Sequence, residues 1–108
     1  DGDATGEVLS PPGRLYMLCV TSFDRLLPRC ARRMARLVEH AAAEGARVVC
    51  LTPDPLYDVC WHDFGSGEVR CYNIDASTMK TMLRARNGVV VLDDGTITDK
   101  RNCRDIRP

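Results

Sequence analysis

The sequence predicts an α/β fold, with a mixed sheet of about five strands, helices on both faces and a closing β-hairpin. Two nearly continuous apolar runs, residues 15–22 and 46–52, are typical of strands that are buried on both faces. Between them, apolar residues at three- and four-residue spacing predict an amphipathic helix. Near the end of the chain, an apolar run followed by Asp93-Asp94-Gly95 predicts a tight hairpin, because Asp-Gly supplies the positive φ angles of such a turn.

The first helix has clear signals at both ends. Pro28 must lie in its first turn, because a proline further along would remove a helical hydrogen bond. Gly45 is suited to end it. Its apolar face is expected to contain Leu27, Cys30, Ala31, Met34, Leu37, Val38 and Ala41.

The middle of the chain is expected to add two helices and one strand. Asp54 can cap a short helix over residues 54–65 that carries Leu56, Val59, Cys60 and Phe64. Residues 68–74 alternate in character and predict a strand. A third helix is expected from about residue 75 to residue 87. The predicted order is therefore β-α-β-α-β-α-β-β.

The 108 residues are expected to form one domain, residues 14–108, preceded by a polar stretch, residues 1–13, with the composition of a linker or the edge of a cloned fragment. Fifteen basic and fifteen acidic residues balance, so no general attraction to nucleic acid is expected. No run reaches the roughly 18–20 apolar residues of a membrane span, and no signal peptide is recognised. Since the chain does not begin with Met, neither absence excludes a membrane anchor in a longer parent protein.

The element order and the segment MKTMLRARNGVVVLDDGTI together resemble the thioredoxin-like fold, in the branch of membrane-anchored thiol–disulfide reductases and peroxiredoxins. A closer resemblance is to the soluble C-terminal domain of DoxX-type membrane proteins of Bacteroidetes. Those domains carry a segment like L-K-T-M-I-R-x-N-P-G, followed by apolar residues and D-G. The matching residues here are Met79, Lys80, Thr81, Met82, Arg84, Asn87, Gly88, Asp94, Gly95, Lys100, Asp105 and Pro108. The resemblance implies a three-layer thioredoxin-like sandwich from Leu15 onward.

Two parts of the redox apparatus of such proteins are missing. Redox-active members place a CxxC motif between the first strand and the first helix, where this chain has residues 21–25, TSFDR. They also carry a cis-proline before the penultimate strand, at a position that corresponds to Asn87 here. The resemblance therefore implies an interaction or regulatory domain without chemistry of its own. Its expected partners are the membrane-embedded remainder of the same chain and a protein; no cofactor, small-molecule ligand or nucleic acid is expected.

Six cysteines, residues 19, 30, 50, 60, 71 and 103, are too widely spaced for a CxxC pair. Cys19, Cys50 and Cys71 fall in apolar strand-like runs, where cysteine behaves as a small buried hydrophobe. Mostly reduced thiols are therefore expected, together with a reducing compartment. For a domain attached to the inner membrane through its parent protein, this reasoning favours the cytoplasmic side, although redox relatives often work outside that membrane.

Cys30 is the candidate thiol for chemistry. Close to a helix N-terminus and beside Arg29 and Arg33, its thiolate would be stabilised. The alternative is a packing role, because Cys30 shares the apolar stripe of its helix. The alternative function is a non-standard thiol–disulfide oxidoreductase that uses one cysteine outside a CxxC motif, or two that the fold brings together, such as members of the strand set Cys19, Cys50 and Cys71.

A basic stripe, Arg29, Arg32, Arg33 and Arg36, lies opposite the apolar face of the first helix. In a membrane-tethered domain, each such residue near anionic lipid contributes about 1 kcal/mol. The stripe contains like-charge pairs four residues apart, which cost an isolated helix some stability. The stripe is thus a candidate partner-binding site. The alternative is a solvated face countered by Glu39, Glu44 and nearby aspartates.

The segment CWHD, residues 60–63, could suggest half of a metal site. A structural zinc site normally needs four ligands, and the only other histidine, His40, falls on a different predicted helix. The expected alternative is a short amphipathic helix with an exposed His62 and no metal.

Overall fold

A computed structural model describes residues 13–53, 60–83 and 87–106 of the chain. A six-stranded mixed sheet carries one helix on each face, which confirms the α/β class and corrects the expected count of about five strands. The strands are β1 (Arg14–Val20), β2 (Arg47–Thr52), β3 (Cys60–Asp63), β4 (Glu68–Asn73), β5 (Asn87–Asp93) and β6 (Thr96–Asn102). The helices are α2 (Pro28–Glu44) and α3 (Ala76–Met82), with short 3-10 turns η1 (Phe23–Arg25) and η2 (Cys103–Asp105).

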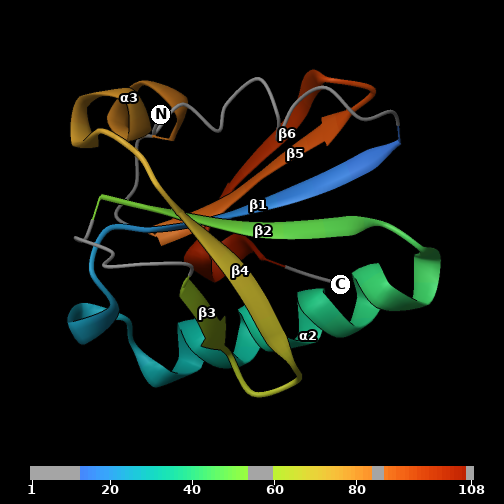
Figure 1. Ribbon diagram of the computed structural model, residues 1–108, viewed down its shortest axis with the longest axis horizontal. Coiled ribbons are helices and arrows are strands. Elements are labelled where there is room, and N and C mark those ends of the chain that lie inside the picture. The colour runs from blue at the N-terminus through green and yellow to red at the C-terminus, as the bar shows by residue number, and fades with distance from the viewer. Residues whose placement is uncertain (1–12, 54–59, 84–86, 107–108) are drawn as a thin grey trace.

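The strand order across the sheet is β3-β4-β2-β1-β5-β6 (Figure 1). β1 lies inside the sheet, where it pairs in parallel with β2 and antiparallel with β5. β4 continues the parallel arrangement beside β2, while β3 and β6 add antiparallel strands at the two edges. The sheet is therefore parallel at its centre and closed on each side by a hairpin.

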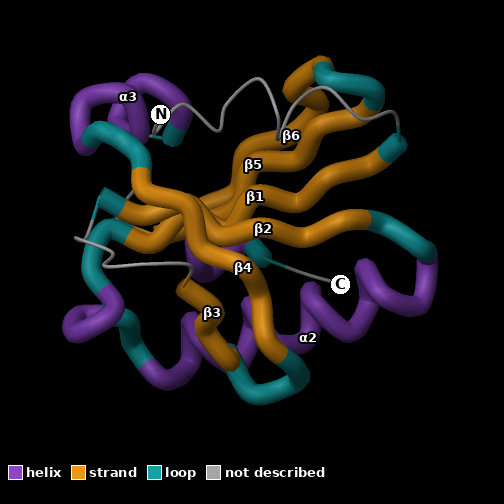
Figure 2. Tube along the Cα trace, in the orientation of Figure 1, coloured by secondary structure: helices purple, strands orange, loops and turns teal. Residues whose placement is uncertain are grey.

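The sheet divides the core into two apolar layers, one beneath α2 and one beneath α3. Figure 2 shows these two helices on opposite faces of the sheet. Side chains along a strand point alternately to opposite faces, so β1 supplies both layers. Tyr16, Leu18 and Val20 face α2, and Leu15, Met17 and Cys19 face α3. The near-continuous apolar run of β1 is explained by burial on both of its faces.

The predicted bounds of α2 are confirmed. Pro28 is its first residue, and Gly45 closes it with a φ of 76°, a left-handed conformation that favours glycine. Leu27, however, does not belong to the buried face: it lies outside the helix as the N-cap residue and is 58% exposed. Pro28 at the first helical position favours an extended conformation in the residue before it, which turns Leu27 away from the core.

The predicted helix over residues 54–65 is wrong in its C-terminal part, and residues 54–59 lie outside the described residues. Cys60 to Asp63 form the edge strand β3, which pairs with β4. The carboxylate of Asp63 accepts hydrogen bonds from the backbone N–H groups of Gly65 (2.7 Å) and Gly67 (3.3 Å). These bonds hold the pKa of Asp63 below its ordinary value and close the turn that folds β3 back onto β4.

The closing hairpin and α3 follow the predicted local signals. Asp94 and Gly95 have φ angles of 52° and 84°, as a two-residue hairpin turn requires. Asp75 caps α3 by accepting hydrogen bonds from the N–H groups of Ser77 and Thr78. The helix ends at Met82, earlier than expected, and residues 84–86 lie outside the described part of the chain. No helix in the described part is long and apolar enough to cross a membrane.

Gly88 is required where β5 passes close to β6. A Cβ atom built on Gly88 would overlap the backbone oxygen of Arg101 and lie 2.8 Å from Cδ2 of Leu83 and 3.1 Å from Cα of Asn102. The first and last of these neighbours are backbone atoms, which can move only if the two strands separate. The strand pairing therefore has no room for a side chain at this position.

We predict that Gly88→Ala lowers the free energy of unfolding by about 2–3 kcal/mol, because overpacking forces the β5–β6 pair apart. Urea unfolding followed by circular dichroism measures this change. Thr96→Ala, an exposed position on β6, is the control and should change stability by less than about 0.5 kcal/mol. Equal stability of Gly88→Ala and the wild type would contradict the close approach of the strands.

Candidate functional site at the Cys30–Cys103 disulfide

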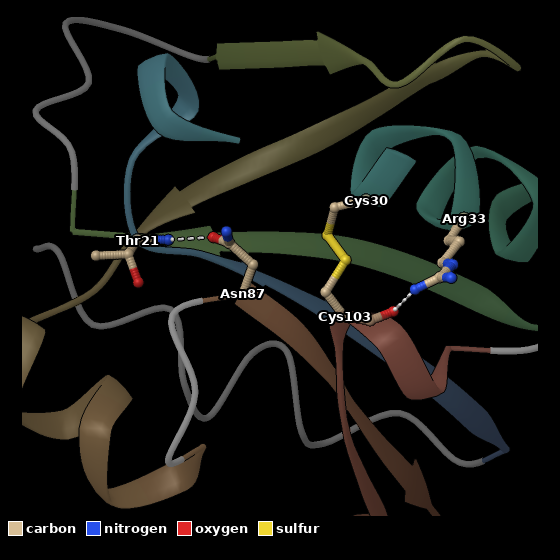
Figure 3. The surroundings of a disulfide bond; sticks show 5 residues. All are labelled: Thr21, Cys30, Arg33, Asn87 and Cys103. Carbon is tan, nitrogen blue, oxygen red and sulfur yellow. Dashed lines mark hydrogen bonds between the residues drawn. A yellow bond between two sulfur atoms is a disulfide. The ribbon is translucent and has the colours of Figure 1, made fainter. Parts of the chain in front are cut away.

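Cys30 and Cys103 form a disulfide that joins two segments 73 residues apart in the sequence (Figure 3). Cys30 is the third residue of α2, and Cys103 begins η2 directly after β6. Their Cα atoms are 5.6 Å apart, within the usual range for a disulfide. The bond attaches the C-terminal segment of the described chain to the first turn of the long helix.

The expectation of mostly reduced thiols is therefore corrected for Cys30 and Cys103. Cys30 is the expected member of the apolar face of α2, but it is not a free thiol. Cys103 was missed altogether, because no local pattern announces a bond across 73 residues, and spacing alone cannot show that two Cα atoms lie within bridging distance. Only the even cysteine count pointed towards pairing. The side chain of Cys60 lies outside the described residues.

The disulfide lies at the edge of the core, with unequal burial of its two halves. Cys30 is 1% exposed, whereas Cys103 is only partly buried. Nη1 of Arg33, one turn along α2, donates a hydrogen bond to the carbonyl oxygen of Cys103 at 3.3 Å. Ile106, three residues after Cys103, is buried in the same apolar layer. The bond, the arginine and the isoleucine together hold the C-terminal segment against α2.

The connection between β1 and α2 carries no thiol. It contains η1, and its first residue, Thr21, donates its backbone N–H to Oδ1 of Asn87 at 3.1 Å (Figure 3). Asn87 opens β5, whose pairing with β1 places it opposite Val20. No cis peptide bond occurs in the described residues. A side-chain-to-backbone hydrogen bond thus joins the two positions where redox-active thioredoxin-like proteins are expected to carry their motif and their cis-proline.

The strand cysteines Cys19, Cys50 and Cys71 are buried and reduced, as expected. Burial raises the pKa of Cys19 to about 12, so this residue carries almost no thiolate at neutral pH. Cys50 and Cys71 are register partners on β2 and β4 and face α2, whereas Cys19 faces α3. The fold therefore separates Cys19 from the other two, and the candidate strand set does not meet at one site.

His62 is a packing residue on β3, which corrects the expectation of an exposed histidine on a helix. Its ring lies 4.4 Å from the ring of Phe23 and 4.6 Å from that of Phe64. Burial lowers its pKa, against the opposing effect of the adjacent Asp63. In residues 13–53, 60–83 and 87–106, no group of three or more His, Cys, Asp or Glu side chains is placed to hold a metal.

The predicted basic stripe divides into two parts. Arg29, Arg32 and Arg36 are exposed, whereas Arg33 is partly buried and directed to Cys103. Glu44, a proposed counter-charge, instead pairs with His40 at 3.3 Å and accepts a 2.6 Å hydrogen bond from the hydroxyl of Tyr16. The ion pairs found in the described part of the chain are Arg14–Asp93, His40–Glu44 and Arg101–Asp99. The three exposed arginines are in none of them.

We predict that removing the disulfide lowers the free energy of unfolding by about 2–4 kcal/mol, because the cross-link restricts the unfolded chain across a long loop. The test compares urea midpoints of the wild type with and without reductant. The variant Cys30→Ala/Cys103→Ala should unfold at a lower urea concentration, and reductant should not shift its midpoint. A wild-type midpoint that reductant leaves unchanged would contradict a stabilising cross-link.

Comparison of the chain with protein-family models, with curated proteins and with solved structures finds no match. What this protein does must therefore be inferred from its own features. These are a disulfide at the first turn of α2, a β1–α2 connection without a thiol, and three exposed arginines that form no ion pair in the described residues.

Proposed function

We propose that this chain is a thioredoxin-like domain of a bacterial integral membrane protein of DoxX type, acting in an interaction or regulatory role without CxxC chemistry. The order of elements supports the thioredoxin-like assignment. The unit β1-α2-β2 is parallel, α3 lies on the opposite face of the sheet, and the hairpin β5–β6 pairs antiparallel with β1. The hairpin β3–β4 is added after β2, in the part of the chain where a helix and a strand were expected.

The hydrogen bond between Thr21 and Asn87 carries the functional part of this proposal, because it joins the positions where the resemblance expects the CxxC motif and the cis-proline. Thiol–disulfide chemistry needs a reactive sulfur, and the β1–α2 connection presents none. Of the two cysteines that flank this connection in the sequence, Cys19 is buried in β1, and Cys30 is buried and bonded to Cys103. The disulfide is then a structural cross-link that holds the C-terminal segment against α2. What the domain retains for function is its surface.

The disulfide also bears on the compartment. Disulfides persist in oxidising environments such as the bacterial periplasm and are rare in the reducing cytosol. The reasoning that favoured the cytoplasmic side depended on mostly reduced cysteines, and the bond between Cys30 and Cys103 weakens it. We therefore place the domain on the outer side of the inner membrane in this proposal.

The first test is insulin reduction by dithiothreitol, with Cys30→Ala/Cys103→Ala as the matched control. We expect the wild-type domain to give no turnover above buffer, and the control variant to give the same rate. Peptide mapping without reductant should recover Cys30 and Cys103 in one disulfide-linked pair. Insulin turnover that the control variant lacks would overturn the proposal of an inactive domain.

A second candidate function, thiol–disulfide exchange through Cys30 and Cys103, is favoured by the place of the bond. A thiolate in the first turn of a helix and beside Arg29 is stabilised by the helix dipole and the cation, which makes Cys30 a good leaving group. Cys103 is the more exposed of the two residues, so attack on the disulfide is expected at its sulfur. In such an exchange, a substrate thiolate would attack Cys103, and Cys30 would be the leaving group.

The exchange step balances with a dithiol substrate. One substrate thiolate attacks the sulfur of Cys103, a mixed disulfide forms, and Cys30 leaves with the electron pair as a thiolate. The second substrate thiolate attacks the substrate sulfur of that mixed disulfide and releases Cys103 as a thiolate. The substrate dithiol becomes a disulfide, and the domain's disulfide becomes two thiols that take up the two protons.

A glutathione titration separates the two candidates. For the structural cross-link, we expect Cys30–Cys103 to stay oxidised at potentials down to about −300 mV, as structural disulfides in secreted proteins do. Alkylation and mass spectrometry measure the reduced fraction. A midpoint between about −270 and −120 mV, the range of dedicated oxidoreductases, would instead support exchange and remove the structural interpretation.

A further inference from the structure

One outward surface of α2 combines three arginines with an exposed leucine. We call it the α2 arginine surface: Leu27, Arg29, Arg32 and Arg36. The arginines are spaced by three and four residues, so they lie on one side of the helix, opposite the buried Cys30, Met34, Leu37 and Ala41. Leu27 precedes the helix and is 58% exposed. Exposed arginines thus extend from the first turn to the middle of α2, and an exposed apolar side chain directly precedes the helix.

The charge placement is unfavourable for the helix itself. The N-terminal end of a helix carries a partial positive charge, which favours acidic residues there, yet the first turn of α2 contains none and includes Arg29. Arg32 and Arg36 form a like-charge pair four residues apart, which destabilises a helix by about 0.2–0.5 kcal/mol. Neither arginine has an ion pair in the described residues. Arg29 in the first turn and the Arg32–Arg36 pair therefore cost the helix stability, although Glu39 lies three residues after Arg36 on the same side. An external anionic partner would offset this cost.

Leu27 distinguishes among anionic partners. At an anionic bilayer, guanidinium groups meet lipid phosphates while a neighbouring apolar side chain enters the boundary between headgroups and acyl chains. A nucleic acid offers no such apolar layer to Leu27, and the chain as a whole carries no net positive charge. The α2 arginine surface is also the outside of a helix, a convex shape that suits a flat surface.

We propose that the α2 arginine surface lies against an anionic membrane surface. This inference rests on the proposed function, since attachment to a membrane protein would hold the domain close to the bilayer. Such attachment would strengthen the contact, because tethering raises the effective concentration of lipid at the surface. Contact of α2 with the membrane would then orient the whole domain. The β3–β4 hairpin would keep a fixed place in that orientation, because Oγ of Ser66 donates a hydrogen bond to the carbonyl oxygen of Ala35 in α2.

The direct test is sedimentation of the isolated chain with vesicles of phosphatidylcholine, with and without 40 mol% phosphatidylglycerol. Measurements at about 10 mM ionic strength keep electrostatic attraction strong, because the Debye length is then about 30 Å. We expect binding only to the anionic vesicles, and a loss of binding at about 0.5 M salt. Circular dichroism confirms that each variant is folded.

Variants of equal charge identify the surface. Arg29→Gln/Arg32→Gln/Arg36→Gln should lower the partition coefficient roughly a hundredfold, from about 1 kcal/mol for each of three residues. Arg47→Gln/Arg70→Gln/Lys100→Gln removes the same charge from exposed positions on the strands and should leave binding within about threefold of the wild type. Leu27→Ser should weaken binding about tenfold without changing its salt dependence.

Three outcomes would overturn the inference. They are no binding to anionic vesicles at low salt, an equal loss in the strand control variant, and binding of polyglutamate in the absence of vesicle binding, which would assign the surface to an acidic protein. None of these outcomes depends on sulfur chemistry. The insulin and glutathione experiments therefore test the proposed function separately from this surface.

Discussion

The pairing of β1 on both sides is the constraint on which the rest of this structure depends. From Leu15 to Val20 every residue is buried, and alternate side chains supply the layer beneath α2 and the layer beneath α3. Because β1 has neither an exposed face nor an exposed edge, its register with β2 and β5 decides where all three strands end. Val20 pairs with Asn87, which brings Thr21 within hydrogen-bonding distance of the asparagine side chain.

The closing hairpin transmits this constraint to the C-terminal segment. β5 pairs with β1 along its whole length. Gly88 of β5 allows β6 to lie close to β5 at Asn102, the last residue of β6. Cys103 therefore lies beside the first turn of α2. There it is bonded to the buried Cys30, and its carbonyl oxygen accepts a hydrogen bond from Arg33. The disulfide is a consequence of strand register rather than of any motif that surrounds either cysteine.

The described cysteine side chains and the exposed arginines therefore lie in different parts of the domain. The cysteine side chains that the structure describes are either buried in strands or joined in one bond, and the β1–α2 connection is held by an amide hydrogen bond. The same helix that hides Cys30 presents arginines to solvent on its other side. Under the proposal above, the inner face of α2 is committed to the fold and its outer face is available to an anionic partner.

The sequence by itself determined the elements whose signals are local. Two-faced burial marked β1 and β2, Pro28 and Gly45 marked the ends of α2, and Asp94-Gly95 marked the hairpin, because periodicity, capping and positive φ angles act over a few neighbouring residues. Of the candidate site, the sequence identified Cys30 and the arginines but not their surroundings.

The tertiary structure alone decided the features that depend on distant contacts. Residues 60–63 form a strand because β4 offers an edge and Asp63 closes the turn, although their spacing also suits a helix. Cys103 becomes the partner of Cys30, and Arg33 is drawn away from the other arginines, through packing between segments about 70 residues apart. Such contacts leave no periodic trace in the chain, since the residues involved share neither a turn of helix nor a strand.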